Sequence, residues 1–485
     1  MKNKYSTILF SLSLLTWAAQ AQTYSDALRY SQLESGATAR TVGIGGGIGA
    51  LGADFATLSS NPAGLAVFRS SELVFTPALQ RAKVTGTLKG DGNVAYSDQK
   101  NRFSIANVGV VLATKPKSTR WKTFNIGIGT NCLASFAQNS YYEGSSKSSV
   151  TDRFVAQANA GDFSQFEAGL ANEALAIYQA PGGIYVSDFT GFDGAVMKKQ
   201  SISMTGGINE LDISFAGNYK DKLMIGATLG IPLVGFSEQK TYEEIDPTDK
   251  IPLFNSLKYE ENLTTSGAGI NLKLGLIYRA SQAFRLGFAV HTPTIYSLKD
   301  NYSSTLTYAY TESGQVVSTT KTSPDGSFNY QLNTPLRLIG SVGYIVGKRG
   351  FLSGEVEFVD YTASTFSFAQ NTDKDYEREI NNDIINRFRS TANVRVGGEL
   401  VFDILRLRGG VGLSGSPYLG DTKVTPMYSV GAGIRESSFY IDLAYQHRQI
   451  REGFKPYLVS NPDRQPIVDN LISNNNFILT FGYRF

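Results

Sequence analysis

Three arginines in the last quarter of the chain could bind a carboxylate. Arg395 lies in one predicted strand, and Arg406 and Arg408 lie in the next, on the face that the residue pattern assigns to the interior. A guanidinium group can hold a carboxylate through two parallel hydrogen bonds, so these residues could neutralise an acidic ligand. Ion pairing within the protein is the commoner alternative. The same face carries further charged residues: Lys273, Arg285, Arg337, Glu355, Glu357, Glu399 and Asp442.

Residues for catalysis, metal binding or nucleotide binding are sparse. The 485 residues include two histidines, His291 and His447, and one cysteine, Cys132, which do not make a metal or haem site. Residues 47–52 match G-x-G-x-x-G, but the strand, helix and later acidic residue that dinucleotide binding requires are missing. A formal net charge of +3 gives no indication of nucleic-acid binding. We therefore predict no enzyme activity, no metal and no cofactor.

An apolar binding surface is predicted within the longest connection between strands. Residues 151–180 approximate the spacing of an amphipathic helix, with Phe154, Phe163, Phe166 and Leu170 on one side. Exposed apolar patches mark binding sites, so this segment could form a groove that captures a hydrophobic ligand. The alternative is a loop that packs its own apolar side over the mouth of the structure beneath it.

The elements that carry these residues are predicted to be strands, because apolar and polar residues alternate with a period of two. Leu272 falls on an apolar face, which Phe288 and Val396 continue in later strands, whereas Asn271 falls on a face rich in polar residues and glycine. A soluble sandwich would bury the apolar face, but a transmembrane barrel turns it toward lipid. Glycines on the polar face favour the barrel, because a lumen packed against a plug needs them.

The lengths of the connections also favour a membrane barrel. We count about fourteen strands, with tight turns after even-numbered strands and longer connections after most odd-numbered ones. The longer connections include residues 138–202, 241–262, 311–326, 370–389 and 451–475. Short periplasmic turns, long extracellular loops and an even strand number are typical of outer-membrane barrels. The last strand, residues 476–485, alternates aromatic residues and ends at Phe485.

Two segments precede the predicted barrel. Residues 1–21 have the basic start, short apolar run and small-x-small cleavage pattern of a secretory signal peptide. Residues 22–70 include a stretch rich in glycine and alanine that has too few bulky side chains for a core of its own. We therefore predict a signal peptide at 1–21, an N-terminal plug at 22–70 and a barrel at 71–485, with a long extracellular loop at 138–202.

Together with the signal peptide and the terminal Phe485, the motif Asn-Pro-Ala-Gly-Leu at residues 61–65 resembles the FadL/TodX family. Members of this family are outer-membrane transporters of long-chain fatty acids and other hydrophobic compounds. The resemblance covers nearly the whole mature chain. It implies an all-β fold: a transmembrane antiparallel β-barrel of about fourteen strands with a hatch, formed by the plug, inside the lumen. The hatch residues that it implies are Asn61, Pro62, Ala63 and Gly64.

The resemblance also implies lateral release of the ligand through a break in the third strand. The third predicted strand carries Gly127 and Gly129, which could weaken it locally and allow such an opening. The alternative is that these glycines make room for the plug.

We therefore expect an outer-membrane channel, exported through a cleaved signal peptide in a Gram-negative cell, for passive uptake of long-chain fatty acids or similar lipophiles. Its expected partners are the lipid bilayer, a hydrophobic small molecule and, through the strand ending in Phe485, the barrel-assembly machinery. The alternative is a FadL-like barrel that acts in protein interaction or secretion rather than transport. An open general porin would not need the plug, and haem uptake is neither supported nor excluded.

Overall fold

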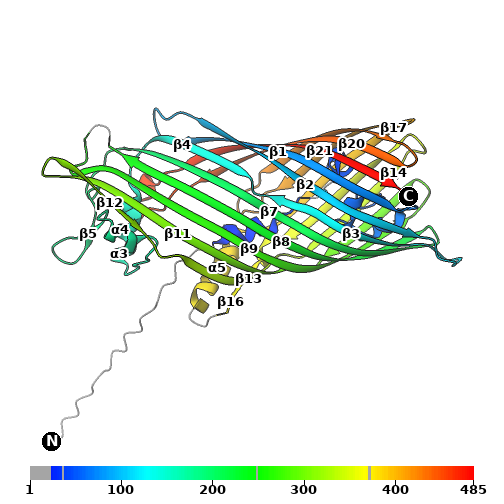
Figure 1. Ribbon diagram of the computed structural model, residues 1–485, viewed down its shortest axis with the longest axis horizontal. Coiled ribbons are helices and arrows are strands. Elements are labelled where there is room, and N and C mark those ends of the chain that lie inside the picture. The colour runs from blue at the N-terminus through cyan, green and yellow to red at the C-terminus, as the bar shows by residue number, and fades with distance from the viewer. Residues whose placement is uncertain (1–22, 35–37, 247–248, 370–372) are drawn as a thin grey trace, which may run out of the picture.

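The computed structural model describes residues 23–34, 38–246, 249–369 and 373–485, and the predicted signal peptide at 1–21 lies outside them. Antiparallel strands form a sheet that closes into a barrel, because β1 (Glu72–Leu88) pairs with β21 (Val468–Arg484). Closure satisfies the backbone hydrogen-bonding groups of both edges, which hydrocarbon cannot do. Figure 1 shows tilted strands along the whole length of this barrel.

The barrel has fourteen strands, as predicted. Four of them are interrupted and therefore carry two labels each. In chain order they are β1, β2 (Tyr96–Thr114), β3 (Trp121–Ser135) with β4 (Gln138–Ser146), β7 (Val196–Tyr219), β8 (Leu223–Ile245), β9 (Phe254–Arg279), β10 (Phe284–His291) with β11 (Ile295–Glu312), β13 (Gly326–Asn333) with β14 (Arg337–Ile345), β15 (Gly350–Asp360) with β16 (Thr365–Phe368), β17 (Ser390–Phe402), β18 (Leu405–Gly415), β19 (Val424–Arg435), β20 (Phe439–Phe454) and β21.

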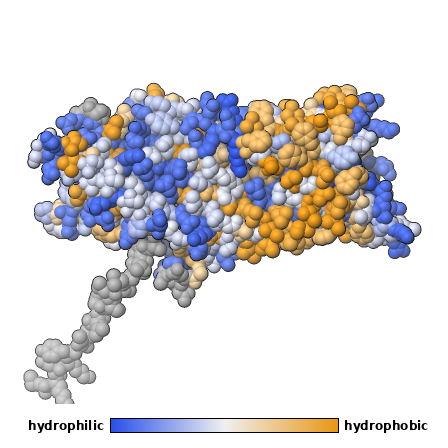
Figure 2. Space-filling view, viewed as in Figure 1, coloured by the Kyte–Doolittle hydropathy of each residue, from blue (hydrophilic) through white to orange (hydrophobic). Residues whose placement is uncertain are grey.

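Side chains alternate between lipid and lumen as the sequence predicts. Leu272, Phe288 and Val396 are 40%, 50% and 57% exposed on the outside, whereas Asn271 and Arg395 are buried inside. Figure 2 shows the hydrophobic residues gathered over the half of the barrel that holds the C-terminus, while the other half is mainly hydrophilic. An apolar belt around a closed sheet is the surface of a transmembrane barrel.

The tight turns lie where they were predicted, but the strands reach further than expected on the opposite side. β4 and β7 continue to Ser146 and from Val196, so the long loop comprises residues 147–195 rather than 138–202. These extensions stand beyond the apolar belt, where polar residues fill both faces and the alternation that marks a strand is lost.

Three predicted loops also contain regular structure. The loop at 311–326 includes β12 (Gln315–Thr322), which pairs with β11, and the loop at 370–389 includes α5 (Lys374–Arg387). The loop at 147–195 holds α3 (Val150–Asn159), α4 (Ala168–Glu173) and a small hairpin of β5 (Tyr178–Gln179) and β6 (Tyr185–Val186). No helix among the described residues is long and apolar enough to span a membrane.

The N-terminal segment lies inside the barrel. Its elements are α1 (Tyr24–Ser31), α2 (Ala39–Gly43) and the 3₁₀ turns η1 (Phe55–Leu58) and η2 (Pro62–Val67). Nearly every residue from 38 to 68 is buried, and Figure 1 shows this blue segment enclosed by the strands. We call residues 38–68 the plug.

The outward orientation of Val396 can be tested by charge insertion. Val396→Arg places a guanidinium on the lipid face and is expected to destabilise the barrel by about 2–4 kcal/mol near the bilayer midplane. The measurement is the free energy of unfolding in lipid vesicles. Asn101→Arg, on the hydrophilic half of β2, is the matched control and should change stability little. Equal stability of Val396→Arg and wild type would contradict the orientation.

Candidate functional site: a lumen cavity above a fastened plug

Asn61 joins the plug to itself and to the wall. Its Oδ1 accepts a hydrogen bond from the Ala63 nitrogen at 3.1 Å, so it caps η2. Its Nδ2 donates to the oxygens of Gly49 at 2.7 Å and of Leu276, in β9, at 3.3 Å. The predicted hatch residue Asn61 therefore holds two turns of the plug against one wall strand.

Wall glycines form the surface on which this part of the plug rests. A Cβ atom at Gly226, in β8, would lie 2.7 Å from the Ala63 nitrogen, and one at Gly275, in β9, would lie 2.9 Å from Cδ of Pro62. Such contacts are too short, so only glycine allows the plug this close. Gly64 plays the same part within the plug, where a Cβ would lie 2.6 Å from Cγ2 of Thr57.

Further wall side chains bind the plug backbone from several directions. Arg285 donates to the oxygen of Leu51 at 2.9 Å, and Glu355 accepts from the nitrogen of Gly49 at 3.1 Å. Asn125 donates to the oxygen of Leu65 at 2.8 Å, and the ring of His291 lies 2.7 Å from the oxygen of Ser60. Residues 38–68 have little regular structure, so these bonds satisfy backbone groups that would otherwise be buried without partners.

The three arginines predicted to clamp a carboxylate do not form one patch. Arg395 pairs with Glu355 at 2.9 Å and Glu357 at 2.6 Å, and Arg408 pairs with Glu399 and Asp442, both at 2.7 Å. Arg406 instead donates to backbone oxygens of the tight turn, including that of Leu405. Glu355, Glu357 and Glu399 lie on strands next to those of their arginines, whereas Asp442 lies two strands from Arg408. The register between strands brings these groups together, and the sequence does not reveal it. Arg395 and Arg408 therefore form ion pairs within the protein, which was the alternative to a carboxylate clamp.

The ion pair between Arg408 and Glu399 also contacts the plug. Arg40, in α2, lies 3.7 Å from Glu399 and 3.9 Å from Asp54, and it donates to the oxygen of Ala53 at 2.8 Å. All three charged side chains are buried. Removal of one partner would leave a buried charge uncompensated, so this group fixes the plug to the wall.

The wall has a seam between the second and third strands. The β2–β3 ladder begins at the pair Asn107↔Asn131. Within the part of the chain that the structure describes, residues 96–106 of β2 pair only with β1. Arg102 bridges the seam, because its guanidinium donates to Oγ of Ser135 at 2.8 Å and to the oxygen of Gly206. Lys100 likewise donates to Oγ of Ser203 at 2.8 Å.

Gly127 and Gly129, the residues predicted to permit a lateral opening, lie within the intact ladder, opposite Val111 and Gly109. A Cβ atom at Gly127 would lie 2.9 Å from Cδ2 of Leu58, and one at Gly129 would lie 2.5 Å from Cζ of Phe55. Both glycines therefore give room to the plug. The seam and the interruption between β3 and β4 lie further along the strand.

A cavity of about 960 Å³ lies above the plug. Its volume is at the upper end of the roughly 300–1,000 Å³ typical of ligand pockets. The lining comes from α1, the plug, the end of β3 beside the seam, and the extracellular ends of β17–β21. The side chains that line the cavity include Leu28, Glu34, Val42, Ala134, Phe136, Gln446, Arg448, Asn474, Asn476 and Ile478.

The charges of this cavity are partly balanced within it. Arg29 pairs with Asp26 in α1, and its guanidinium lies 4.2 Å from the ring centre of Phe236. Removal from bulk water raises the pKa of the Glu34 carboxyl above its usual value, and the positive charge of Arg448 offsets part of this rise. Polar and apolar side chains therefore share one cavity.

The predicted apolar groove in the long loop is not formed. Phe154 and Leu170 are buried, and Phe154 packs against Tyr259 of β9 at a ring distance of 5.5 Å. Phe166 contacts Tyr302, whereas Phe163 is 40% exposed. The helical spacing breaks because α3 ends before Gly161, whose φ of +86° a helix cannot continue through. The loop packs its apolar side over the barrel mouth, which was the alternative.

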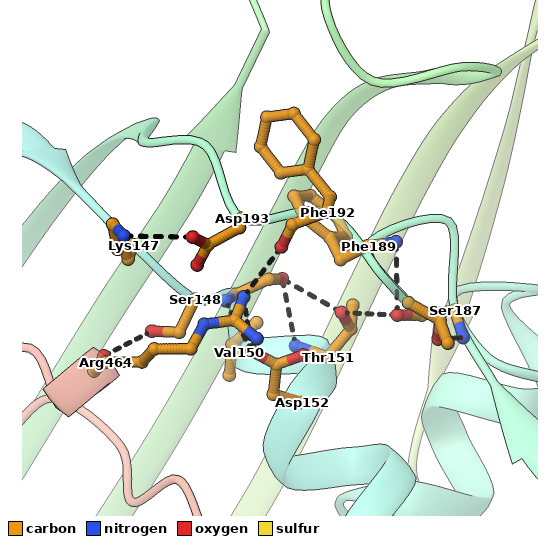
Figure 3. Close-up of polar contacts among 12 residues, drawn as sticks. Lys147, Ser148, Val150, Thr151, Asp152, Ser187, Phe189, Phe192, Asp193 and Arg464 are labelled. Atoms are coloured by element: carbon orange, nitrogen blue, oxygen red, sulfur yellow. Dashed lines mark hydrogen bonds and ion pairs between the residues drawn. The ribbon is translucent and has the colours of Figure 1, made fainter. Parts of the chain in front are cut away.

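Polar contacts fasten this loop to the last extracellular loop (Figure 3). Arg464 donates to the oxygen of Phe192 at 3.0 Å and lies 3.6 Å from Asp152, and its own oxygen accepts from Ser148 at 2.9 Å. Lys147 pairs with Asp193 at 3.1 Å within the long loop. We call residues 147–195 and 455–467 the cap.

Removal of the Asn61 side chain should loosen the plug. Asn61→Ala leaves the buried oxygen of Gly49 without its donor, at a cost of about 1–3 kcal/mol. Amides of residues 44–68 are then expected to exchange with deuterium about tenfold to a hundredfold faster than in wild type. Ser59→Ala, which removes only a local bond to Ala56, is the control. Unchanged exchange in Asn61→Ala would contradict the fastening role.

Solved structures share this architecture. A Pseudomonas aeruginosa FadL homologue has a TM-score of 0.53 and 15% identity, over 90% of this chain and 96% of its own. The Pseudomonas putida toluene transporter TodX has a TM-score of 0.51 and 14% identity, over 93% of this chain and 99% of its own. These likenesses confirm the FadL/TodX fold that the sequence resembled. No protein-family profile and no curated protein sequence matches this chain.

Proposed function

We propose that this protein is an outer-membrane channel of the FadL/TodX type for passive uptake of hydrophobic small molecules, such as long-chain fatty acids or similar lipophiles. The observation that carries the proposal is the cavity above the plug, which reaches from the extracellular ends of β17–β21 to the seam beside β3. The similar fold of a toluene transporter and a FadL homologue supports it. Diffusion along such a route needs no nucleotide, metal or catalytic group.

The plug is the proposed gate. It fills the lumen below the cavity and is held by hydrogen bonds, by ion pairs and by apolar contacts that Phe55 and Leu58 share with the wall. Polar bonds can exchange with water or with one another at modest net cost, so part of the plug can shift while the barrel stays closed. Asn61, Pro62, Ala63 and Gly64 are the residues that we expect to move.

Lateral release is proposed at the seam between β2 and β3. Within the described part of the chain, β2 has no backbone pairing with β3 at this level, and the side chains of Arg102 and Lys100 bridge the wall instead. Phe103 and Ile105 stand exposed on the outer face at this level. A ligand that leaves between these strands, once the plug has shifted, would pass from the cavity to an apolar surface. The opening would therefore not disturb the ladder at Gly127 and Gly129.

The location follows from the apolar belt and from the expected signal peptide at 1–21. A chain with these features is exported and inserted into the outer membrane of a Gram-negative cell. We propose that the aromatic strand β21, which closes the sheet against β1, is the part that the barrel-assembly machinery recognises through Phe485.

Uptake is tested with purified protein in liposomes and labelled oleate. Wild type is expected to raise uptake above that of empty liposomes. A disulfide between cysteines at Gly43, in α2, and Gly431, in β19, would lock the plug to the wall. The two positions are in contact, because a Cβ at Gly43 would lie 3.3 Å from Cα of Gly431. Oxidised Gly43→Cys/Gly431→Cys, in a Cys132→Ser background, should take up little oleate.

Reduction of the locked protein should restore uptake, which provides the internal control. No uptake by wild type above empty liposomes would contradict the channel function itself. Equal uptake by the oxidised and reduced forms would instead contradict gating by the plug and leave the channel function in place.

Loss of the seam bridge should speed release. Arg102→Ala removes the hydrogen bonds to Ser135 and Gly206 and is expected to increase the initial rate of oleate uptake severalfold. Lys83→Ala, at an exposed position on the neighbouring strand β1, is the control. A rate equal to that of the control would argue against release at this seam.

A further inference from the structure

Two tight turns at the end of the barrel that holds the C-terminus concentrate positive charge. The β2–β3 turn at residues 115–120 and the β7–β8 turn at residues 220–222 are adjacent, because the nitrogen of Lys220 donates to the oxygen of Arg120 at 2.7 Å. With the start of β3 they carry six exposed cations, which we call the basic turns: Lys115, Lys117, Arg120, Lys122, Lys220 and Lys222.

No acidic side chain balances this charge. Residues 115–122 contain neither aspartate nor glutamate. Asp221 lies within the second turn, but it pairs with Arg69 at 2.7 Å and accepts a hydrogen bond from Asn218 at 2.8 Å. Within the described part of the chain, no ion pair includes a residue of the basic turns. The charge therefore attracts anions from outside the protein.

An aromatic cluster lies beside the basic turns on the outer face of the wall. The ring of Trp121 lies over Gly217 of β7, where a Cβ atom would come within 2.8 Å of its Cζ3. Phe124 stacks on this ring at 4.9 Å, and Tyr219 meets it edge-on at 5.3 Å. Tryptophan and tyrosine gather where hydrocarbon gives way to lipid head groups. The cluster therefore marks that boundary on β3 and β7.

The position of the basic turns favours a lipid over a soluble partner. The next outward residues along β3 and β7 include Phe124 and Phe215, which are 46% and 56% exposed on the lipid face. Figure 2 shows hydrophilic residues at this end of the barrel, directly beyond the apolar belt. A lysine here can lay its apolar stem along the belt and place its ammonium group among the head groups.

We propose that the basic turns and Trp121 bind the head group of an anionic phospholipid in the periplasmic leaflet of the membrane. The ammonium and guanidinium groups contact the phosphate, and the aromatic cluster contacts the glycerol and upper acyl region. A zwitterionic lipid neutralises its own phosphate, so it gains less from this site. The bound lipid holds the turn that joins the two strands of the seam, and its binding requires no transported ligand.

Trp121 itself reports on the lipids around it. The chain has one other tryptophan, Trp17, within the predicted signal peptide. Protein purified from outer membranes is placed in equimolar phosphatidylglycerol and phosphatidylcholine, with bromine on the acyl chains of one lipid or the other. Bromine quenches tryptophan fluorescence at short range, so the two quenching values give a relative binding constant. We expect phosphatidylglycerol to bind about threefold to tenfold more strongly, and 1 M sodium chloride to remove the preference.

Fourfold variants test the basic turns. Lys115→Gln/Lys117→Gln/Lys220→Gln/Lys222→Gln should bring the relative binding constant close to one. Arginine at the same four positions keeps the charge and should keep the preference. The matched control removes four exposed lysines from the other half of the barrel and should behave as wild type: Lys83→Gln/Lys250→Gln/Lys299→Gln/Lys321→Gln.

Equal quenching by the two lipids in wild type would overturn the proposal and favour an acidic periplasmic protein as the partner of the basic turns. A preference that survives in the glutamine variant or in high salt would overturn it as well. Loss of the preference in the control variant would do the same, because net charge alone would then explain it. Glycerol phosphate, a head group without acyl chains, should not reduce the preference at constant ionic strength, and a reduction would indicate a site for free phosphate instead.

Discussion

The requirement that every backbone N–H and C=O be satisfied within hydrocarbon governs this structure. Each strand of the sheet pairs with both of its neighbours, and the pairing of β1 with β21 removes the last free edges. The seam lies toward the outer end of the apolar belt, where Arg102 and Lys100 take the place of missing backbone pairs. A lateral opening is therefore confined to a level at which side chains and water can replace the ladder.

Closure of fourteen strands creates a lumen too wide for the wall side chains to fill, and the plug fills it. Glycines such as Gly226 and Gly275 bring the two surfaces together, and wall side chains supply partners for the irregular plug backbone. The low dielectric of this interior explains why most lumen charges are paired, since an isolated buried charge is costly. Among the described residues, the cations without an ion-pair partner include Arg285, which donates to the oxygen of Leu51, and Arg448, which lines the cavity.

The sequence could predict which side chains face lipid and which face the lumen, because side chains alternate along a strand with a period of two and one face must suit lipid. Leu272, Phe288 and Val396 follow that rule, as do the inward charges. This alternation does not reveal the register between neighbouring strands. The pairing of Arg395 with Glu355 and Glu357, and of Arg408 with Asp442, therefore could not be read from the chain.

Other features escaped prediction for local reasons. α5 and β12 lie beyond the apolar belt, where no lipid face imposes alternation. The groove expected from Phe154 and Leu170 did not form. The apolar residues keep a helical spacing across Gly161 in the sequence, but the helix α3 ends before this glycine. The seam depends on where β2 separates from β3, which is again a matter of register. The alternation of side chains along β20 predicts that Arg448 faces the lumen. It does not predict whether an inward-facing arginine has an ion-pair partner.

The most direct measurement of the central claim is native mass spectrometry of the protein released gently from outer membranes. The account predicts a small lipophile bound in the cavity above the plug. A protein that carries no lipophile and instead retains a partner protein would contradict uptake and favour a role in protein interaction.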